Sequence, residues 1–154
     1  MKVKVFFVFA FLFTFNFCYS QLSLPKGFRC VSMRGETNMR DSYFSDGTFR
    51  FHSDAWGREV EDPSDMVAFI SKMYGNVLKF RKTQDNLYWA TGMVNNEYKY
   101  VIIVPSAYTT IALSSKTKNA QFSNYSAWLL QQTRINISSG KDYYFTDYRG
   151  KECL

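Results

Sequence analysis

The chain has few of the residues that build metal, haem and disulfide-rich scaffolds. Its 154 residues include one histidine and three cysteines, which excludes zinc fingers, haem-binding motifs and a dense disulfide framework. Hydrophobic residues make up 46% and charged residues 21% of the chain, so wholesale disorder is excluded, as are collagen-like repeats. A chain of this length has room for one compact domain.

No apolar stretch is long enough to cross a bilayer, which takes about 20 residues. The most apolar segment, Val5–Phe17, follows two lysines and precedes Cys18-Tyr19-Ser20. A basic start, a short apolar centre and small side chains before the cut are typical of a signal peptide. We therefore predict a signal peptide over 1–20, cleavage before Gln21, and a single exported domain over 21–154. This domain would lack a transmembrane segment and be periplasmic or secreted.

Of the three cysteines, one is predicted to be removed with the signal peptide and two to form a disulfide. Cys18 follows Phe15-Asn16-Phe17, whereas a lipidated cysteine normally follows small residues, so we expect it to leave with the signal. The alternative is a lipid anchor through Cys18. Cys30 and Cys153 then remain near the two ends, and in an oxidising compartment they are predicted to form a disulfide. On the chain-entropy view such a bond stabilises the fold by at most roughly 4 to 5 kcal/mol. Two free thiols are the alternative.

Charge of one sign is only modestly in excess. Losing Lys2 and Lys4 with the signal takes the 19 basic residues to 17 against 13 acidic ones, a net charge of +4. The basic residues are spread along the chain, apart from a cluster at Lys79, Arg81 and Lys82. Apolar side chains alternate with the first two, as in a strand with one solvated face. We therefore predict no nucleic-acid partner.

Patterning predicts short strands with two helices. Asp46-Gly47 is typical of a tight hairpin turn between aromatic strands, and Asn95-Asn96 of a second one. A helix is expected from Pro63 to Gly75, with an apolar stripe at Met66, Phe69, Ile70, Met73 and Tyr74. Another is expected over 122–137. Strands are expected over 77–81, 87–94, 97–104 and 108–113. The predicted class is α+β, a mainly antiparallel sheet with two packed helices.

The order of these elements over most of 40–137, a hairpin, a helix, four strands and a helix, resembles the PsbP-like sandwich in topology. Members of that fold family are mostly exported or peripheral proteins that dock onto larger assemblies. The resemblance therefore implies a binding role, by analogy at the level of fold.

Catalytic residues are sparse. Any histidine mechanism must use His52, which shares a predicted strand face with Asp54. The two could form an orienting pair, with a nucleophile such as Ser106 or Ser114 supplied from elsewhere. The alternative is a polar histidine at a strand edge. The carboxylates near Asp62 are explained by helix capping, and neither a cofactor nor a metal site is predicted.

Aromatic residues are plentiful in the predicted strands. Tyr98 and Tyr100 share one face with Ile102, and Tyr88 shares a face with Gly92, which would leave a depression. Together with Trp56, such rings can bind a protein, a peptide or a glycan, or they can be core beneath the helices. We therefore expect a non-enzymatic binding domain with a protein partner. The alternative is a small secreted hydrolase using His52 with Asp54.

Overall fold

The computed structural model describes residues 22–34, 41–57, 59–139, 145–151 and 153. The predicted signal peptide, with Cys18, lies outside these residues. The strands are β1 (Leu22–Ser23), β2 (Arg29–Arg34), β3 (Asp41–Ser45), β4 (Phe49–Ala55), β5 (Arg81–Lys82), β6 (Tyr88–Val94), β7 (Glu97–Val104), β8 (Thr109–Ser115) and β9 (Phe145–Thr146). The helices are α1 (Met66–Met73) and α2 (Ala120–Ser139), with 3₁₀ turns η1 (Pro63–Asp65) and η2 (Pro105–Ala107).

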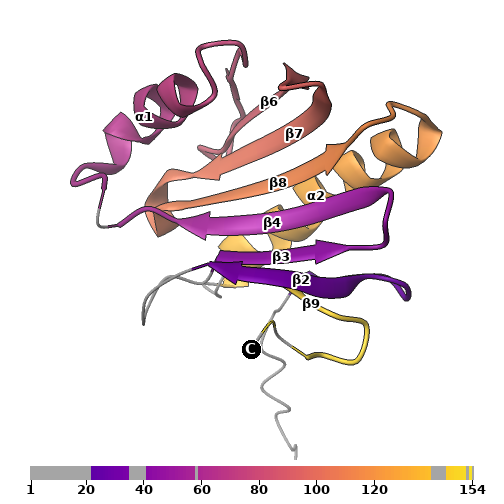
Figure 1. Cartoon of the computed structure of the whole chain (residues 1–154). Coiled ribbons are helices and arrows are strands. Elements are labelled where there is room, and N and C mark those ends of the chain that lie inside the picture. The colour runs from indigo at the N-terminus through magenta and orange to yellow at the C-terminus, as the bar shows by residue number, and fades with distance from the viewer. Residues whose placement is uncertain (1–21, 35–40, 58, 140–144, 152, 154) are drawn as a thin grey trace, which may run out of the picture.

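Seven strands form one antiparallel sheet in the order β2-β3-β4-β8-β7-β6-β5. With the two helices this makes the α+β class that the sequence predicts. Figure 1 shows α2 crossing one face of the sheet behind β4 and β8. The α1 helix packs near the start of β6 and the end of β7. No helix in the described part of the chain is long and apolar enough to span a membrane.

Turn chemistry explains why the strands pair as they do. Asp46 Oδ1 accepts hydrogen bonds from the backbone N–H groups of Thr48 and Phe49, and Gly47 has φ +97°. Asn95 and Asn96 have φ values of 50° and 62°, the left-handed pair that a two-residue hairpin turn requires. Both predicted hairpins are confirmed.

The α2 face of the sheet is closed by aromatic and aliphatic side chains. Phe51 is completely buried, and its ring lies 5.5 Å from Tyr125 and 5.6 Å from Trp128 of α2. Two buried hydroxyl side chains of α2, Ser126 and Thr133, donate hydrogen bonds to carbonyls one turn earlier in the helix. A helix with little apolar character can therefore pack on the core, because its buried hydroxyls are paired.

The first helix follows the predicted pattern at its start. Asp62 accepts a hydrogen bond from the Ser64 N–H, and Pro63 opens the 3₁₀ turn that leads into α1. Met66 and Ile70 are buried, but Met73 is 55% exposed, so the apolar stripe is shorter than predicted. The strand expected over 77–81 is wrong for most of its length, since only Arg81–Lys82 pairs with β6. Leu78 is instead buried on the α1 face of the sheet.

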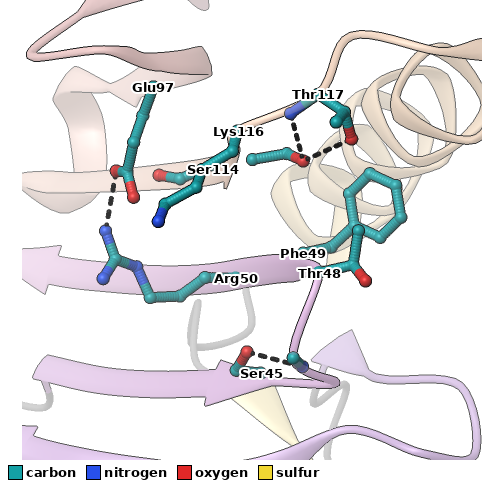
Figure 2. A pocket seen from close by; sticks show the side chains of 10 residues that line it. Ser45, Thr48, Phe49, Arg50, Glu97, Ser114, Lys116 and Thr117 are labelled. Atoms are coloured by element: carbon teal, nitrogen blue, oxygen red, sulfur yellow. Dashed lines mark hydrogen bonds and ion pairs between the residues drawn. The ribbon is translucent and has the colours of Figure 1, made fainter.

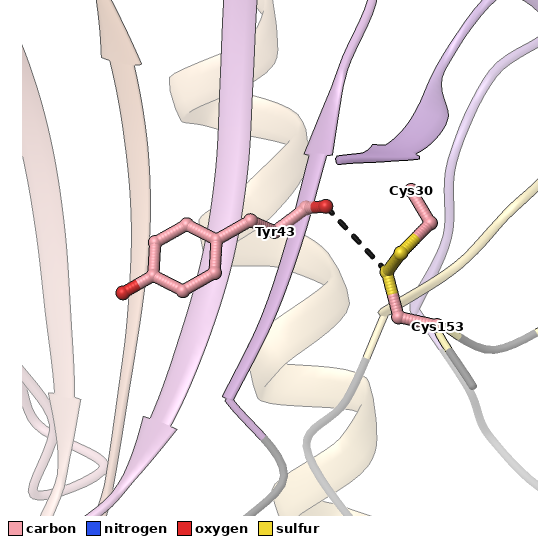
Figure 3. The surroundings of a disulfide bond; sticks show 3 residues. All are labelled: Cys30, Tyr43 and Cys153. Atoms are coloured by element: carbon pink, nitrogen blue, oxygen red, sulfur yellow. Dashed lines mark hydrogen bonds between the residues drawn. A yellow bond between two sulfur atoms is a disulfide. The ribbon is translucent and has the colours of Figure 1, made fainter. Parts of the chain in front are cut away.

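Both ends of the described chain meet at the α2 face. β1 pairs in parallel with β9, and Leu22 and Phe145 are fully buried in the core beneath α2. Cys30 and Cys153 form the predicted disulfide, with their Cα atoms 5.3 Å apart. Cys153 Sγ lies 3.5 Å from the Tyr43 carbonyl oxygen, and Figure 3 shows this contact beside the disulfide. A disulfide sulfur carries no hydrogen, so this approach is a packing contact.

Candidate functional site

Alternation along β4 separates a core face from a polar one. Phe49 and Phe51 point toward α2, while Arg50, His52 and Asp54 occupy the opposite face. Pairing with β8 places Ser114 beside Arg50, and pairing with β7 places Lys99 beside Ser114. Three central strands thus bring charged and hydroxyl side chains together on the α1 side of the sheet, where residues one strand apart lie about 5 Å from each other.

His52 is the most deeply buried titratable group of this polar face. It is 6% exposed, and its ring stacks on Tyr43 with centroids 5.1 Å apart. Burial, reinforced by the positive charges of Lys99 and Arg50, lowers the pKa of His52 to about 3. His52 Nε2 lies 3.4 Å from Asp54 Oδ2. Because the imidazole is neutral near pH 7, this contact joins a neutral ring to a carboxylate and is not an ion pair.

The C-terminal end of α1 also meets this polar face. Burial, followed by the nearby charge of Asp54 and by Tyr43, raises the pKa of the Tyr74 hydroxyl well above its usual range. Tyr74 is therefore neutral at physiological pH, as is His52. Among the described residues, Tyr43 and Asp54 contact the His52 ring, and the charges of Lys99 and Arg50 lower its pKa.

His52 and Asp54 lie side by side, but the described contacts do not extend from them to a nucleophile. Ser114 Oγ accepts a hydrogen bond from Lys99 Nζ at 3.0 Å, and His52 Nδ1 is buried without a hydrogen-bond partner among the described residues. Ser106 lines a separate pocket of about 170 Å³ with Pro63 and Tyr88. A Ser–His–Asp relay needs a carboxylate beside the histidine and a serine bonded to it. The described residues provide the carboxylate, Asp54, but no serine bonded to His52.

A larger pocket, of about 320 Å³, opens where the β3–β4 turn faces the segment that follows β8. Figure 2 shows Arg50, Glu97 and Lys116 grouped on one side of it. Its lining consists of Ser45, Gly47, Thr48, Phe49, Arg50, Glu97, Ser114, Ser115, Lys116 and Thr117. This size is at the lower end of the range for small-ligand sites.

A charged network holds the floor of this pocket. Glu97 Oε2 lies 3.0 Å from an Arg50 terminal nitrogen and 3.2 Å from Lys99 Nζ. The same Lys99 ammonium donates to Ser114. One carboxylate therefore serves two cations. Of these charged groups Lys99 is the buried one, and its pairing with Glu97 lowers the cost of burying its charge.

The predicted aromatic residues lie on opposite faces of the sheet. Tyr98 and Tyr100 do share a face, but it is the α2 face: Tyr98 packs against Phe122, and Tyr100 is 6% exposed in the core. Trp56 and Tyr88 are half-buried on the α1 face, where the Trp56 indole N–H donates to Thr110. The core alternative holds for Tyr100, and the four rings do not form one row.

The depression expected at Gly92 is filled. A side-chain carbon at Gly92 would lie only 2.9 Å from Leu78 Cδ2, so this leucine occupies the space that the missing side chain leaves. Periodicity shows that Gly92 and Tyr88 share a face, but it cannot show that a non-sheet segment, 77–80, folds over that face.

Sequence reasoning missed Glu97, Lys99 and Lys116 as site residues. The available signal was that Glu97 and Lys99 share one face at the start of an otherwise apolar strand. Central strands are usually apolar on both faces, so two charges on one face indicate a polar site. Their convergence with Arg50 depends on the strand order, which places β8 between β4 and β7.

Comparison of the chain with protein-family models, with curated proteins and with solved structures found no match. The PsbP-like topology therefore stays a prediction. Within the described residues, no group of three or more His, Cys, Asp or Glu side chains is placed to hold a metal ion.

Proposed function

We propose that the chain is an exported binding module that docks onto a partner protein through the pocket at the β3–β4 turn. The observation that carries this proposal is a pocket lined by charged and hydroxyl side chains beside the β3–β4 turn. Figure 1 shows that this turn lies at the end of the sheet away from α1. The described contacts of His52, Asp54 and Ser114 support binding better than they support hydrolysis. The Cys30–Cys153 disulfide supports export to an oxidising compartment.

The location and the solvation of the pocket both suit a protein partner. Thr48 and Lys116 are exposed at its rim, whereas Ser114 beneath them is 1% exposed. The accessible polar groups at the rim match the polar, solvent-accessible rim of protein interfaces. The paired charges beneath them can be complemented by a polar group of a partner. The partner would present a polar group to the pocket while its surrounding surface covers the rim.

Site-specific photo-cross-linking in the native envelope or culture fluid tests this function. A photoreactive amino acid at Thr48 is compared with the same residue at Ser123, which is exposed on α2. We expect one defined product from position 48 and none at that mass from position 123. Products that are the same at both positions, or no product at position 48, would contradict docking through the pocket.

A charge-reversal pair makes the test specific. Lys116→Glu, combined with the photoreactive residue at position 48, should abolish the product because Lys116 lines the pocket. Lys118→Glu is the matched control, since Lys118 is exposed in the same connection but is not among the lining residues. Equal loss from both variants would show that only net charge matters.

A further inference from the structure

We infer that the pocket receives a single carboxylate of the partner protein, either from an acidic side chain or from a chain terminus. This inference rests on the proposed function and names the group that the site recognises. The balance of donors, acceptors and charge around the Arg50–Glu97–Lys99 network supports it.

The pocket contains hydrogen-bond donors that the described structure leaves unused. An ammonium group only donates, so Ser114 Oγ is the acceptor in its bond with Lys99, and its own hydrogen remains to be given to another acceptor. Arg50 Nε is buried without a partner among the described residues. In Figure 2 the Lys116 side chain extends toward Arg50 and Glu97. These donors call for an acceptor group.

The local charge balance favours a ligand with one negative charge. The charged residues that line the pocket are two cations, Arg50 and Lys116, and one carboxylate, Glu97. The excess is one positive charge. A monoanion would neutralise it, whereas a phosphate carrying nearly two charges would leave the site negative.

The backbone of the pocket argues further against phosphate. Phosphate sites are usually nests of free backbone N–H groups. Here the N–H groups of Gly47, Thr48 and Phe49 donate to the side chains of Ser45 and Asp46, and that of Thr117 donates to Ser115. The unused donors are side-chain groups, and a carboxylate with two oxygens can accept from the Ser114 hydroxyl and the Lys116 ammonium together.

Nuclear magnetic resonance titration of the mature, disulfide-bonded chain tests the inference. The probes are three five-residue peptides at fixed ionic strength: blocked peptides with a central Glu or a central Gln, and an all-glycine peptide with a free C-terminus. We expect saturable shifts of the backbone amide signals of 114–117 with at least one carboxylate peptide and none with the Gln peptide. Which carboxylate peptide binds identifies the source of the group.

The lysine pair again supplies the control. Lys116→Gln should weaken binding of the carboxylate peptide about threefold, the effect of losing one partly solvated charge pair, and Lys118→Gln should leave it unchanged. Inorganic phosphate that binds the same amides more tightly than either carboxylate peptide would overturn the assignment. So would the absence of a saturable response to both. Cross-linking at Thr48 tests docking through the pocket independently of this titration. Failure of carboxylate recognition and failure of docking are therefore distinguishable.

Discussion

The two faces of the seven-stranded sheet are built from alternate residues of the same strands, yet they differ in chemistry. On β4, Phe49 and Phe51 enter an apolar layer beneath α2, while Arg50 and His52 enter a polar layer on the other side. The apolar layer excludes water and stabilises the fold through burial. The polar layer holds the buried ammonium of Lys99 and two buried nitrogens, His52 Nδ1 and Arg50 Nε, that have no hydrogen-bond partner among the described residues. Such groups are costly to stability and are expected where a site must hold donors ready.

The coverage of the two faces differs as well. The α2 helix has 20 residues and α1 has eight. The shorter helix and Leu78 cover the part of the α1 face over Val101 and Ile103, and the pocket lies beyond them at the other end of the strands. The partial cover on the α1 face leaves room for a ligand at the pocket, whereas the described residues of α2 and its core leave no such room on the opposite face.

The largest expected effect is the loss of unfolding free energy when a core side chain on the α2 face is removed. Phe51→Ala removes a fully buried ring that contacts four other aromatic rings, and it should lower the free energy of unfolding by about 3–5 kcal/mol. Urea denaturation at pH 7 measures this value. Met73→Ala on exposed α1 surface is the control and should change stability by no more than about 0.5 kcal/mol. Similar losses from both would contradict the assignment of the main core to the α2 face.

The next effect concerns pH and the polar face. The pKa of His52 is about 3 in the folded chain and 6.5 in the unfolded chain, so between these values the unfolded state binds the extra proton. The contribution of His52 to stability is therefore complete above pH 6.5 and is lost as pH falls toward 3, at about 1.4 kcal/mol per pH unit. From pH 6.5 to 4.5 the wild type should lose about 2–3 kcal/mol more than His52→Phe, which keeps a ring to stack on Tyr43.

Denaturation curves at several pH values measure this difference. Carboxylates elsewhere titrate in both proteins, so the difference between the two proteins isolates His52 together with its contact to Asp54. Parallel pH profiles for the wild type and His52→Phe would mean that His52 is accessible to water and protonates normally in the fold.

The smallest expected effect distinguishes binding from stability on the polar face. Glu97→Gln removes the carboxylate that serves Arg50 and Lys99, which should cost roughly 1 kcal/mol because the pairs are partly solvated. The same change should strengthen binding of the carboxylate peptide, since it frees two cations. Glu59→Gln, at an exposed position, should alter neither quantity. Weaker peptide binding by Glu97→Gln would show that Glu97 positions the cations instead of competing with the ligand.

Local patterns were sufficient for most elements of the fold. The hairpin turns at Asp46-Gly47 and Asn95-Asn96, the capped start of the first helix and the Cys30–Cys153 pair follow from side chains that act on their own backbone or from cysteine number. The prediction failed at 77–81, where an alternating pattern with Leu78 and Phe80 suits a strand and an irregular cover equally well.

The sequence by itself determined which residues share a face, because alternation along a strand is a local property of the backbone. Alternation alone puts His52 on one face with Asp54, and Tyr98 on one face with Tyr100. Only the tertiary structure decided which face would be closed by α2, and hence that Tyr100 is core. It also brought Arg50, Glu97 and Ser114 to one pocket, with Lys99 bonded to two of them, because strand order and register are set by the packing of the whole sheet and not by any one segment.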